Sequence, residues 1–227
     1  MSRFVYLLMV VVGMTGLIAC GGDSDSDSTP QEYDGTITIT DFATSLPIEG
    51  ATVCSPGTEE PCLTTDADGV AAFTFTADAD VVMTVEADGY WTARLAVRTF
   101  APEEGAVTNL PAQLAPNAIV DLLTAQAPGL EGDVTEGTGH IVFGAGSGTE
   151  NPTESGWASG VEFTMTPTSG IGPVYFAAGD IVANAAGSGV YSDASATSDN
   201  GLGNYYNVEP GTYTISATHP SRTCVPF

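Results

Sequence analysis

Short runs in which apolar and polar residues alternate recur along most of this chain. Thr36-Ile37-Thr38-Ile39-Thr40 is the clearest of them, and further runs rich in apolar residues follow at 72–75, 81–87, 139–143 and 212–217. Alternation with a period of two predicts strands that bury one face. Turn residues, chiefly Gly, Asp and Pro, separate these runs at short intervals, which is typical of β-sandwiches. The pattern therefore predicts an all-β protein.

The predicted strands occur in the same order twice, which indicates an internal repeat. Residues 139–143 parallel 35–39, and 159–163 parallel the run that begins at Gly50. The turn at 198–201 parallels the turn at 67–69, and 210–217 parallel the strand through Met83 and Val85. Two copies of one unit explain this order most simply. We expect two small Ig/transthyretin-like β-sandwich domains, over 35–100 and 132–227.

The second copy differs from the first in two places. It carries an extra stretch at about 168–197 that is rich in Gly, Ala and Ser. It also ends at Phe227, where the first copy continues into a return strand at 95–97. We therefore expect the second sandwich to have a shortened edge, or the chain to be incomplete.

A helical pattern lies between the two copies. Ile119, Leu122, Leu123 and Gln126 fall at helical spacing, and Pro128-Gly129 stops the run. We predict one short helix within a linker over 101–131. A helix lying in a membrane interface is less consistent with this segment, because it has no basic residue.

The N-terminus has a continuous apolar run instead of an alternating one. Arg3 precedes Phe4–Met14, which is shorter than the roughly 20 apolar residues that span a bilayer. Leu17-Ile18-Ala19-Cys20 matches the bacterial lipobox, so residues 1–19 are predicted to be a lipoprotein signal peptide. Cys20 would then carry the lipid. An ordinary signal peptide, or a membrane anchor with a chance cysteine, is the alternative.

The residues after Cys20 bear on where the protein would be held. Acyl chains on Cys20 would hold the protein on a lipid bilayer. Gly21, where some lipoproteins have Asp, resembles lipoproteins that go on to the outer membrane, so we expect an outer-membrane location. Residues 20–34 contain alternating Asp and Ser and are predicted to be an acidic flexible tether. Loose calcium binding or a surface-export signal are the alternatives for this segment.

The charge of the chain excludes one class of partner. Four Lys and Arg residues stand against 28 Asp and Glu, which gives a net charge of −24. Nucleic acid is not expected as a partner, because phosphate recognition needs a basic face. A cationic partner is electrostatically compatible with this charge, although acidity also serves solubility.

A family resemblance accompanies the repeat. Pro47–Val53 (PIEGATV), Thr64–Gly69 (TTDADG) and Glu86–Tyr90 (EADGY) resemble the motifs of the carboxypeptidase regulatory-like domain, a small transthyretin-like β-sandwich of many envelope proteins. The resemblance covers 35–98 well and 132–227 more weakly. It implies a fold and no catalytic residues. It also implies an adhesive, carbohydrate-facing or scaffolding module, although function transfers poorly from a fold.

Three cysteines remain besides Cys20. Cys54 and Cys62 flank a short Pro- and Gly-containing loop, and in an oxidising compartment we expect them to form a disulfide. A metal site is the alternative, but no histidine lies nearby in the sequence to complete one. Cys224 has no evident partner, so it is expected to be either buried and inert or paired with another chain.

Sites for chemistry are few. His140 and His219 are the two histidines, and no serine lies in a Gly-x-Ser-x-Gly motif. These histidines with Tyr205, Tyr206 and Tyr213 do not match the order of a two-His, two-Tyr iron site. The Asp66–Gly69 turn has part of a calcium-loop pattern, but we interpret it as a turn capped by Asp68.

Three aromatic residues are candidates for facing a ligand. Tyr90, Trp91 and Trp157 lie beside predicted turns, where exposed rings could stack on sugars. Packing in the core is the alternative for each of them. From the sequence we expect no enzyme, no metal and no cofactor. We expect a membrane-anchored envelope lipoprotein that acts as a binding or scaffolding module, with an envelope protein or polysaccharide as its partner. A glycan- or peptidoglycan-binding protein is the first alternative, and a metal-dependent enzyme is the second.

Overall fold

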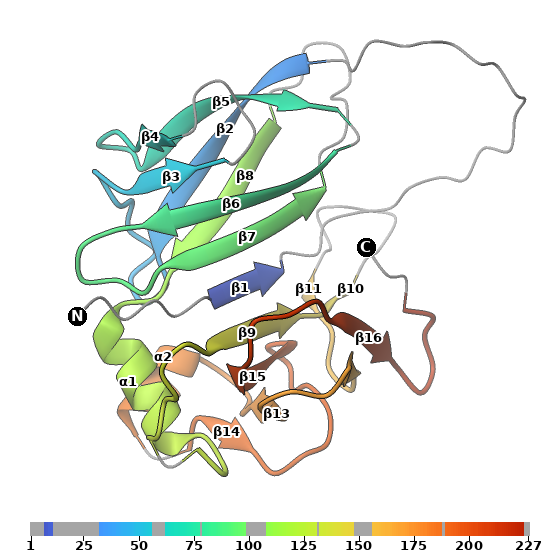
Figure 1. Ribbon diagram of the computed structural model, residues 1–227. Helices are drawn as coiled ribbons and strands as arrows, with labels where there is room; N and C mark the ends of the chain where they lie inside the picture. Colours follow the sequence, from blue (N-terminus) through green and yellow to red (C-terminus); the bar gives the residue numbers. More distant parts are fainter. Residues whose placement is uncertain are drawn as a thin grey trace, which may run out of the picture.

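A computed structural model describes residues 7–10, 32–55, 62–77, 79–98, 108–130, 132–147, 156–187 and 189–224. Cys20, most of the predicted signal peptide and nearly all of the predicted tether lie outside these residues. Within them the chain is mainly β, with two β-sandwiches and two helices, as Figure 1 shows. The predicted all-β sandwich class is confirmed.

The first sandwich consists of two facing layers. One layer has the order β5-β2-β8, formed by β2 (Glu32–Asp41), β5 (Val70–Thr76) and β8 (Thr108–Leu114). The other has the order β7-β6-β3-β4, formed by β3 (Thr52–Cys54), β4 (Cys62–Thr64), β6 (Asp80–Glu86) and β7 (Ala93–Arg98).

The alternating runs produce the core of this sandwich. Ile37 and Ile39 on β2 are fully buried, as are Met83 and Val85 on β6. Polar residues between them, such as Thr38, point to the other face of the sheet, because successive side chains of a strand alternate. Burial of these hydrocarbon side chains holds the two layers together.

One boundary of the predicted linker needs correction. Residues 108–114 were expected in the linker over 101–131, but they form β8, which pairs in parallel with β2 along seven residues. Pro111 within this run argues against a strand on sequence grounds. β8 lies at the edge of its layer, where a missing backbone N–H leaves no inner hydrogen bond unmade.

The second sandwich repeats this plan with additions. β9 (Gly139–Gly144), β13 (Ile171–Phe176), β14 (Tyr191–Ser192) and β15 (Leu202–Val208) form one layer in the order β14-β13-β15-β9. β12 (Glu162–Thr166) and β16 (Thr214–Thr218) form the other layer. A small hairpin of β10 (Gly146–Ser147) and β11 (Gly156–Trp157) lies beside them.

The internal repeat extends to individual hydrogen bonds. The Thr65 hydroxyl donates to the Ile48 carbonyl (2.6 Å) and accepts from the Ala51 N–H (2.9 Å). In the second copy, the Thr197 hydroxyl donates to the Ala158 carbonyl (2.7 Å) and accepts from the Val161 N–H (3.0 Å). Equivalent buried contacts therefore occur at corresponding places in the two copies.

Strand registers repeat as well. Val53 pairs with Val85 across β3 and β6, and Phe163 pairs with Ala217 in the same way across β12 and β16. Thr38 pairs with Val70 across β2 and β5, as Gly144 pairs with Leu202 across β9 and β15. The turns before β5 and β15 place Gly69 and Gly201 at positive φ (73° and 66°). The two copies thus share the pairing of these four strands. One predicted alignment needs correction, because the register matches residues 139–143 with 33–37 and not with 35–39.

Two helices cover one side of the second sandwich (Figure 1). α1 (Asn117–Gln126) lies where the sequence predicted a helix. α2 (Ile181–Ala186) was not predicted and lies in the Gly- and Ala-rich extra stretch. The Asp180 carboxylate caps it by accepting from the Ala183 N–H (2.9 Å), which is the usual signal of a helix start.

β1 (Leu7–Val10) lies between the two sandwiches (Figure 1). It pairs in parallel with β7 on one side and with β9 on the other. Within the described residues, this pairing joins layers of both sandwiches into one sheet of nine strands.

Candidate functional site

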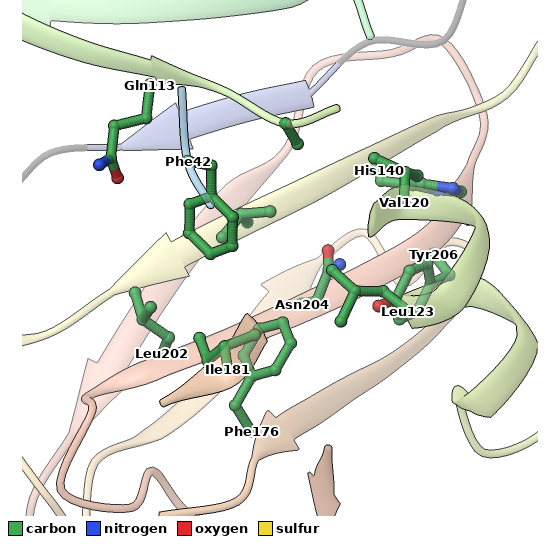
Figure 2. Close-up of a pocket in the computed structure, with 12 residues that line it drawn as sticks. Phe42, Gln113, Val120, Leu123, His140, Phe176, Ile181, Leu202, Asn204 and Tyr206 are labelled. Carbon is green, nitrogen blue, oxygen red and sulfur yellow. The ribbon is translucent and has the colours of Figure 1, made fainter. Parts of the chain in front are cut away.

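A cavity of about 40 Å³ lies at the junction of the two sandwiches. It is formed by the first sandwich, by both helices and by the β9–β15–β13 layer. Figure 2 shows the side chains that converge on it. Twelve residues line it: Phe42, Gln113, Ala115, Val120, Leu123, His140, Val142, Phe176, Ile181, Leu202, Asn204 and Tyr206.

Local sequence explains how each element reaches this cavity. α1 turns Val120 and Leu123, three residues apart, to the same face of the helix. β15 is buried along nearly its whole length, with both faces covered, so Leu202, Asn204 and Tyr206 share the face toward the helices. The extra stretch of the second copy supplies Phe176 and Ile181. The insertion therefore builds one wall of the cavity.

Two buried polar atoms at this cavity have no hydrogen-bond partner among the described residues. They are the Oδ1 atom of Asn204 and the Nε2 atom of His140. Both residues are almost fully buried, with exposed fractions of 3% and 1%. Buried polar atoms are normally paired, and an unpaired one carries a desolvation penalty. These two atoms are therefore the available polar contacts in an otherwise apolar space.

The imidazole of His140 lies between two aromatic rings from different elements. Trp91, which follows β6, stacks on it with ring centroids 5.1 Å apart, and Tyr206 meets it edge-on at 4.8 Å. The Asn207 N–H donates to Nδ1 at 3.3 Å, so the proton of the neutral ring lies on Nε2. His140 is thus held in one orientation from both sandwiches.

Two tyrosines continue this cluster to α1. The hydroxyls of Tyr206 and Tyr191 form a hydrogen bond, and the Tyr191 hydroxyl donates to the Leu123 carbonyl (3.1 Å) near the end of the helix. Carbonyls in the last helical turn have no partner within the helix, so Tyr191 satisfies one of them. The cluster therefore has a structural task, which is to fix α1 on the second sandwich.

The cavity is uncharged at neutral pH. Burial lowers the pKa of His140 to about 4, against a smaller opposing effect of a backbone hydrogen bond at Gly139. Burial also raises the pKa of Tyr206 to about 12, although hydrogen bonds from Tyr191 and Asn204 oppose it. Both rings are therefore neutral under ordinary conditions. Such a lining suits a small neutral guest or ordered water, because one water needs roughly 10–15 Å³ of such space.

The predicted disulfide is confirmed. Cys54 and Cys62 form a disulfide between β3 and β4, with their Cα atoms 4.0 Å apart. The predicted lipidation site, Cys20, lies outside the described residues. Cys224 is a free thiol and is partly buried.

The side chains of Tyr90 and Trp91 contact other residues of the protein and are partly buried. The Tyr90 hydroxyl donates to the Asp41 carboxylate (2.8 Å), and Trp91 packs against the first core and against His140. Burial opposes ionisation of Asp41, but hydrogen bonds from Tyr90 and from the Thr44 and Ala43 N–H groups outweigh it and lower the pKa of Asp41. Packing, the alternative considered for these two aromatic residues, accounts for both.

Trp157 is the exposed member of the three candidates. Its side chain is 50% exposed and lies on β11. The ring passes so close to Gly144 that a Cβ atom there would approach within 2.8 Å of it. The absence of a side chain at Gly144 therefore allows the ring to lie close to the backbone of β9.

The Asp66–Gly69 turn is built as a turn, with one difference from the prediction. The Asp66 carboxylate, not that of Asp68, accepts from the N–H groups of Asp68 (3.0 Å) and Val70 (2.9 Å). Oδ1 of Asp66 thus accepts two hydrogen bonds within the turn. Among the described residues there is no group of three His, Cys, Asp or Glu side chains that could hold a metal ion.

The junction itself was not predicted from the sequence. His140 and Asn204 are on strands with ordinary neighbours, and their meeting depends on how two distant segments pack. A weak signal exists at residues 202–206, where Asn204 interrupts a strand that the structure buries on both faces. In the part of the chain that the structure describes, no helix has the length and apolar character to cross a membrane.

Neither a protein-family model nor a curated protein matches this chain. Among solved structures, it is similar to the Bacillus anthracis TIE protein, at 17% identity over 82% of this chain and 28% of that chain, with a TM-score of 0.28. It is also similar to a streptococcal ancillary pilin, at 15% identity over 84% of this chain and 54% of that chain, with a TM-score of 0.27. This chain thus spans about half, or less, of the length of these proteins.

Proposed function

We propose that this protein is a non-enzymatic lipoprotein of the bacterial envelope, anchored through Cys20, whose two-sandwich body acts as a binding or scaffolding module. The acidic segment 20–34 would separate that body from the bilayer, and the outer membrane is the proposed location. The family proposed for the sandwiches is the carboxypeptidase regulatory-like domain, on the motifs at 47–53, 64–69 and 86–90.

The lining of the junction cavity carries this proposal. It consists of hydrocarbon, aromatic, amide and imidazole groups, without a carboxylate, thiol or aliphatic hydroxyl among its twelve residues. Nucleophilic catalysis needs a nucleophile and a base within hydrogen-bond reach of each other. The one imidazole here has a low pKa and is held by ring stacking. The site therefore supports cohesion and binding better than catalysis.

Mass spectrometry of the membrane-extracted protein tests the anchor. The full gene would be expressed in a bacterial host, and the expected N-terminus is a diacylated or triacylated Cys20. A Cys20→Ala variant should lose the lipid and leave the membrane fraction. A Cys224→Ser variant is the matched control and should remain acylated. An unacylated chain that still begins at Met1 would contradict the proposal.

Glycan binding is a second candidate, because Trp157 presents a half-exposed ring next to Gly144. Sugar rings pack their C–H faces on such aromatic surfaces. A glycan array with the purified protein should then show a signal that Trp157→Ala abolishes and that Leu46→Ala, at another exposed apolar residue, preserves. Equal signals from all three proteins, or no signal from the parent chain, would remove this candidate.

A further inference from the structure

The place of β1 in the sheet matches that of β8 in the first sandwich. Ile37 of β2 and Phe143 of β9 are equivalent, since β2 pairs with β5 in the same register as β9 pairs with β15. β8 lies parallel to β2, with Leu110 beside Ile37. β1 lies parallel to β9, with Val10 beside Phe143. One topological position is thus filled by β8 in the first copy and by β1 in the second.

β8 and β1 differ in whether they would remain in the mature protein. β8 belongs to the body of the protein, whereas Leu7–Val10 belong to the segment that the lipobox marks for removal. Loss of residues 1–19 is part of the proposed function, and this inference rests on it. The processed chain would then have a slot one strand wide between β7 and β9.

The walls of this slot are strand edges. β1 pairs with β7 at Ala93 and Arg94, and with β9 from His140 to Phe143. Both walls run parallel to β1, so a replacement strand has one favourable direction. Exposed N–H and C=O groups of a strand edge are a template for pairing with another chain.

The faces of β9 specify the chemistry of the replacement strand. His140 and Val142 face the junction cavity, while Ile141 and Phe143 pack in the core of the second sandwich. β9 is therefore covered on both sides, unlike β8, on which Asn109 and Pro111 are exposed. A strand beside β9 must be apolar on both faces, as strands buried on both sides are.

We propose that, once residues 1–19 are removed, the slot between β7 and β9 binds an extended apolar segment of another polypeptide, aligned parallel to both strands. The occupant would be a run of about four apolar residues, like Leu7–Val10, presented by a partner protein of the envelope. Insertion would rebuild the nine-strand sheet, and thereby couple binding of the partner to the junction of the two sandwiches.

The first test uses the processed protein extracted from membranes, in which mass spectrometry has established the acylated Cys20. The probe is a synthetic peptide of residues 4–12 with a lysine tail for solubility. The control peptide carries Leu8→Pro and Val10→Pro, which removes backbone donors and keeps length and charge. We expect the probe to raise the melting temperature by about 5 °C at saturation and the control to leave it unchanged.

Cross-linking tests the register. In a Cys224→Ser background, Val142→Cys should form a disulfide with a probe peptide that carries Met9→Cys, because Met9 pairs with Val142. A peptide with Leu8→Cys should react several-fold less, since residue 8 pairs with Ile141 and not with position 142. Circular dichroism would verify that the Val142→Cys protein is folded.

The outcomes separate the two proposals. An N-terminus at Met1 would overturn the lipoprotein proposal and, with it, the vacant slot. An acylated Cys20 with no peptide uptake would overturn the slot proposal alone, whether the protein stays monomeric or fills the slot with a second copy. Uptake without register preference would also overturn it.

Discussion

The imidazole of His140 shows how one buried residue makes stability depend on pH. Its pKa is about 4 in the folded protein and about 6.5 in an unfolded chain, so the unfolded state binds the proton more readily between these values. Stability is then complete above pH 6.5 and declines as the pH falls toward 4, by roughly 3 kcal/mol in total. Urea unfolding at several pH values measures this effect. Between pH 6.5 and 4, the free energy of unfolding should fall more steeply with decreasing pH in the parent protein than in His140→Gln.

Nuclear magnetic resonance provides the direct check on His140. The chain has two histidines, and comparison with His140→Gln assigns the resonance of His140. The Hε1 resonance of His140 should stay in its neutral position down to about pH 5. Titration of His140 near pH 6.5 would contradict the buried position of its ring.

Tyr191 and Tyr33 offer a matched pair of hydroxyl deletions. Tyr191→Phe removes the donor to the Leu123 carbonyl and the partner of the Tyr206 hydroxyl. We expect a loss of about 2 kcal/mol in the free energy of unfolding, because two buried polar atoms lose their partner. Tyr33→Phe should be neutral or slightly stabilising, since the Tyr33 hydroxyl is buried without a partner among the described residues. Chemical denaturation measures both, and similar losses would refute the assignment.

At the scale of elements, one threonine in each copy holds the turn that precedes β3 or β12. Thr65→Val and Thr197→Val keep the shape of the side chain and remove both hydrogen bonds of its hydroxyl. Each variant should lose about 2 kcal/mol of stability, since a buried N–H and a buried C=O lose their partner. Thr74→Val, on an exposed strand position, should change stability by less than about 0.5 kcal/mol.

If one of these two variants loses much stability and the other loses none, the equivalent hydrogen bonds do not contribute equally to the stability of the two copies. Thermal melts of the three variants distinguish these cases.

Among the elements that were missed, α2 and β8 were missed for different physical reasons. α2 is a six-residue helix of Ile, Val, Ala and Asn, too short to display a periodic pattern, and its clearest signal is the Asp180 cap. β8 contains Pro111, a residue that normally interrupts strands, and its edge position in the sheet makes it tolerable. For β8 the decisive information is its pairing with β2, which is distant in sequence.

At the scale of the whole molecule, Trp91 links the two sandwiches. It packs against the core of the first and stacks on His140 of the second. Trp91→Ala should therefore destabilise the protein by about 3 kcal/mol and weaken the coupling between the halves. Calorimetry should show one transition in the parent chain and a broadened or divided transition in the variant.

Trp157→Ala is the control for this experiment, since that ring is half-exposed at the end of the second sandwich. We expect it to shift stability by less than about 1 kcal/mol and to keep one transition. If Trp91→Ala behaves like Trp157→Ala, the two sandwiches are not coupled through the stacked rings.

The sequence by itself determined the strands with alternating patterns, the order in which they recur, the first helix and the pairing of Cys54 with Cys62. These features depend on local alternation, turn residues and short separations, such as Thr36–Thr40 or the Asp66–Gly69 turn. Only the tertiary structure decided that Asn204 and His140 meet in one cavity, that Trp91 faces inward and that β1 lies where β8 lies in the other copy. Each of these depends on packing between segments 49 or more residues apart, and local patterns carry no information about which distant surfaces meet.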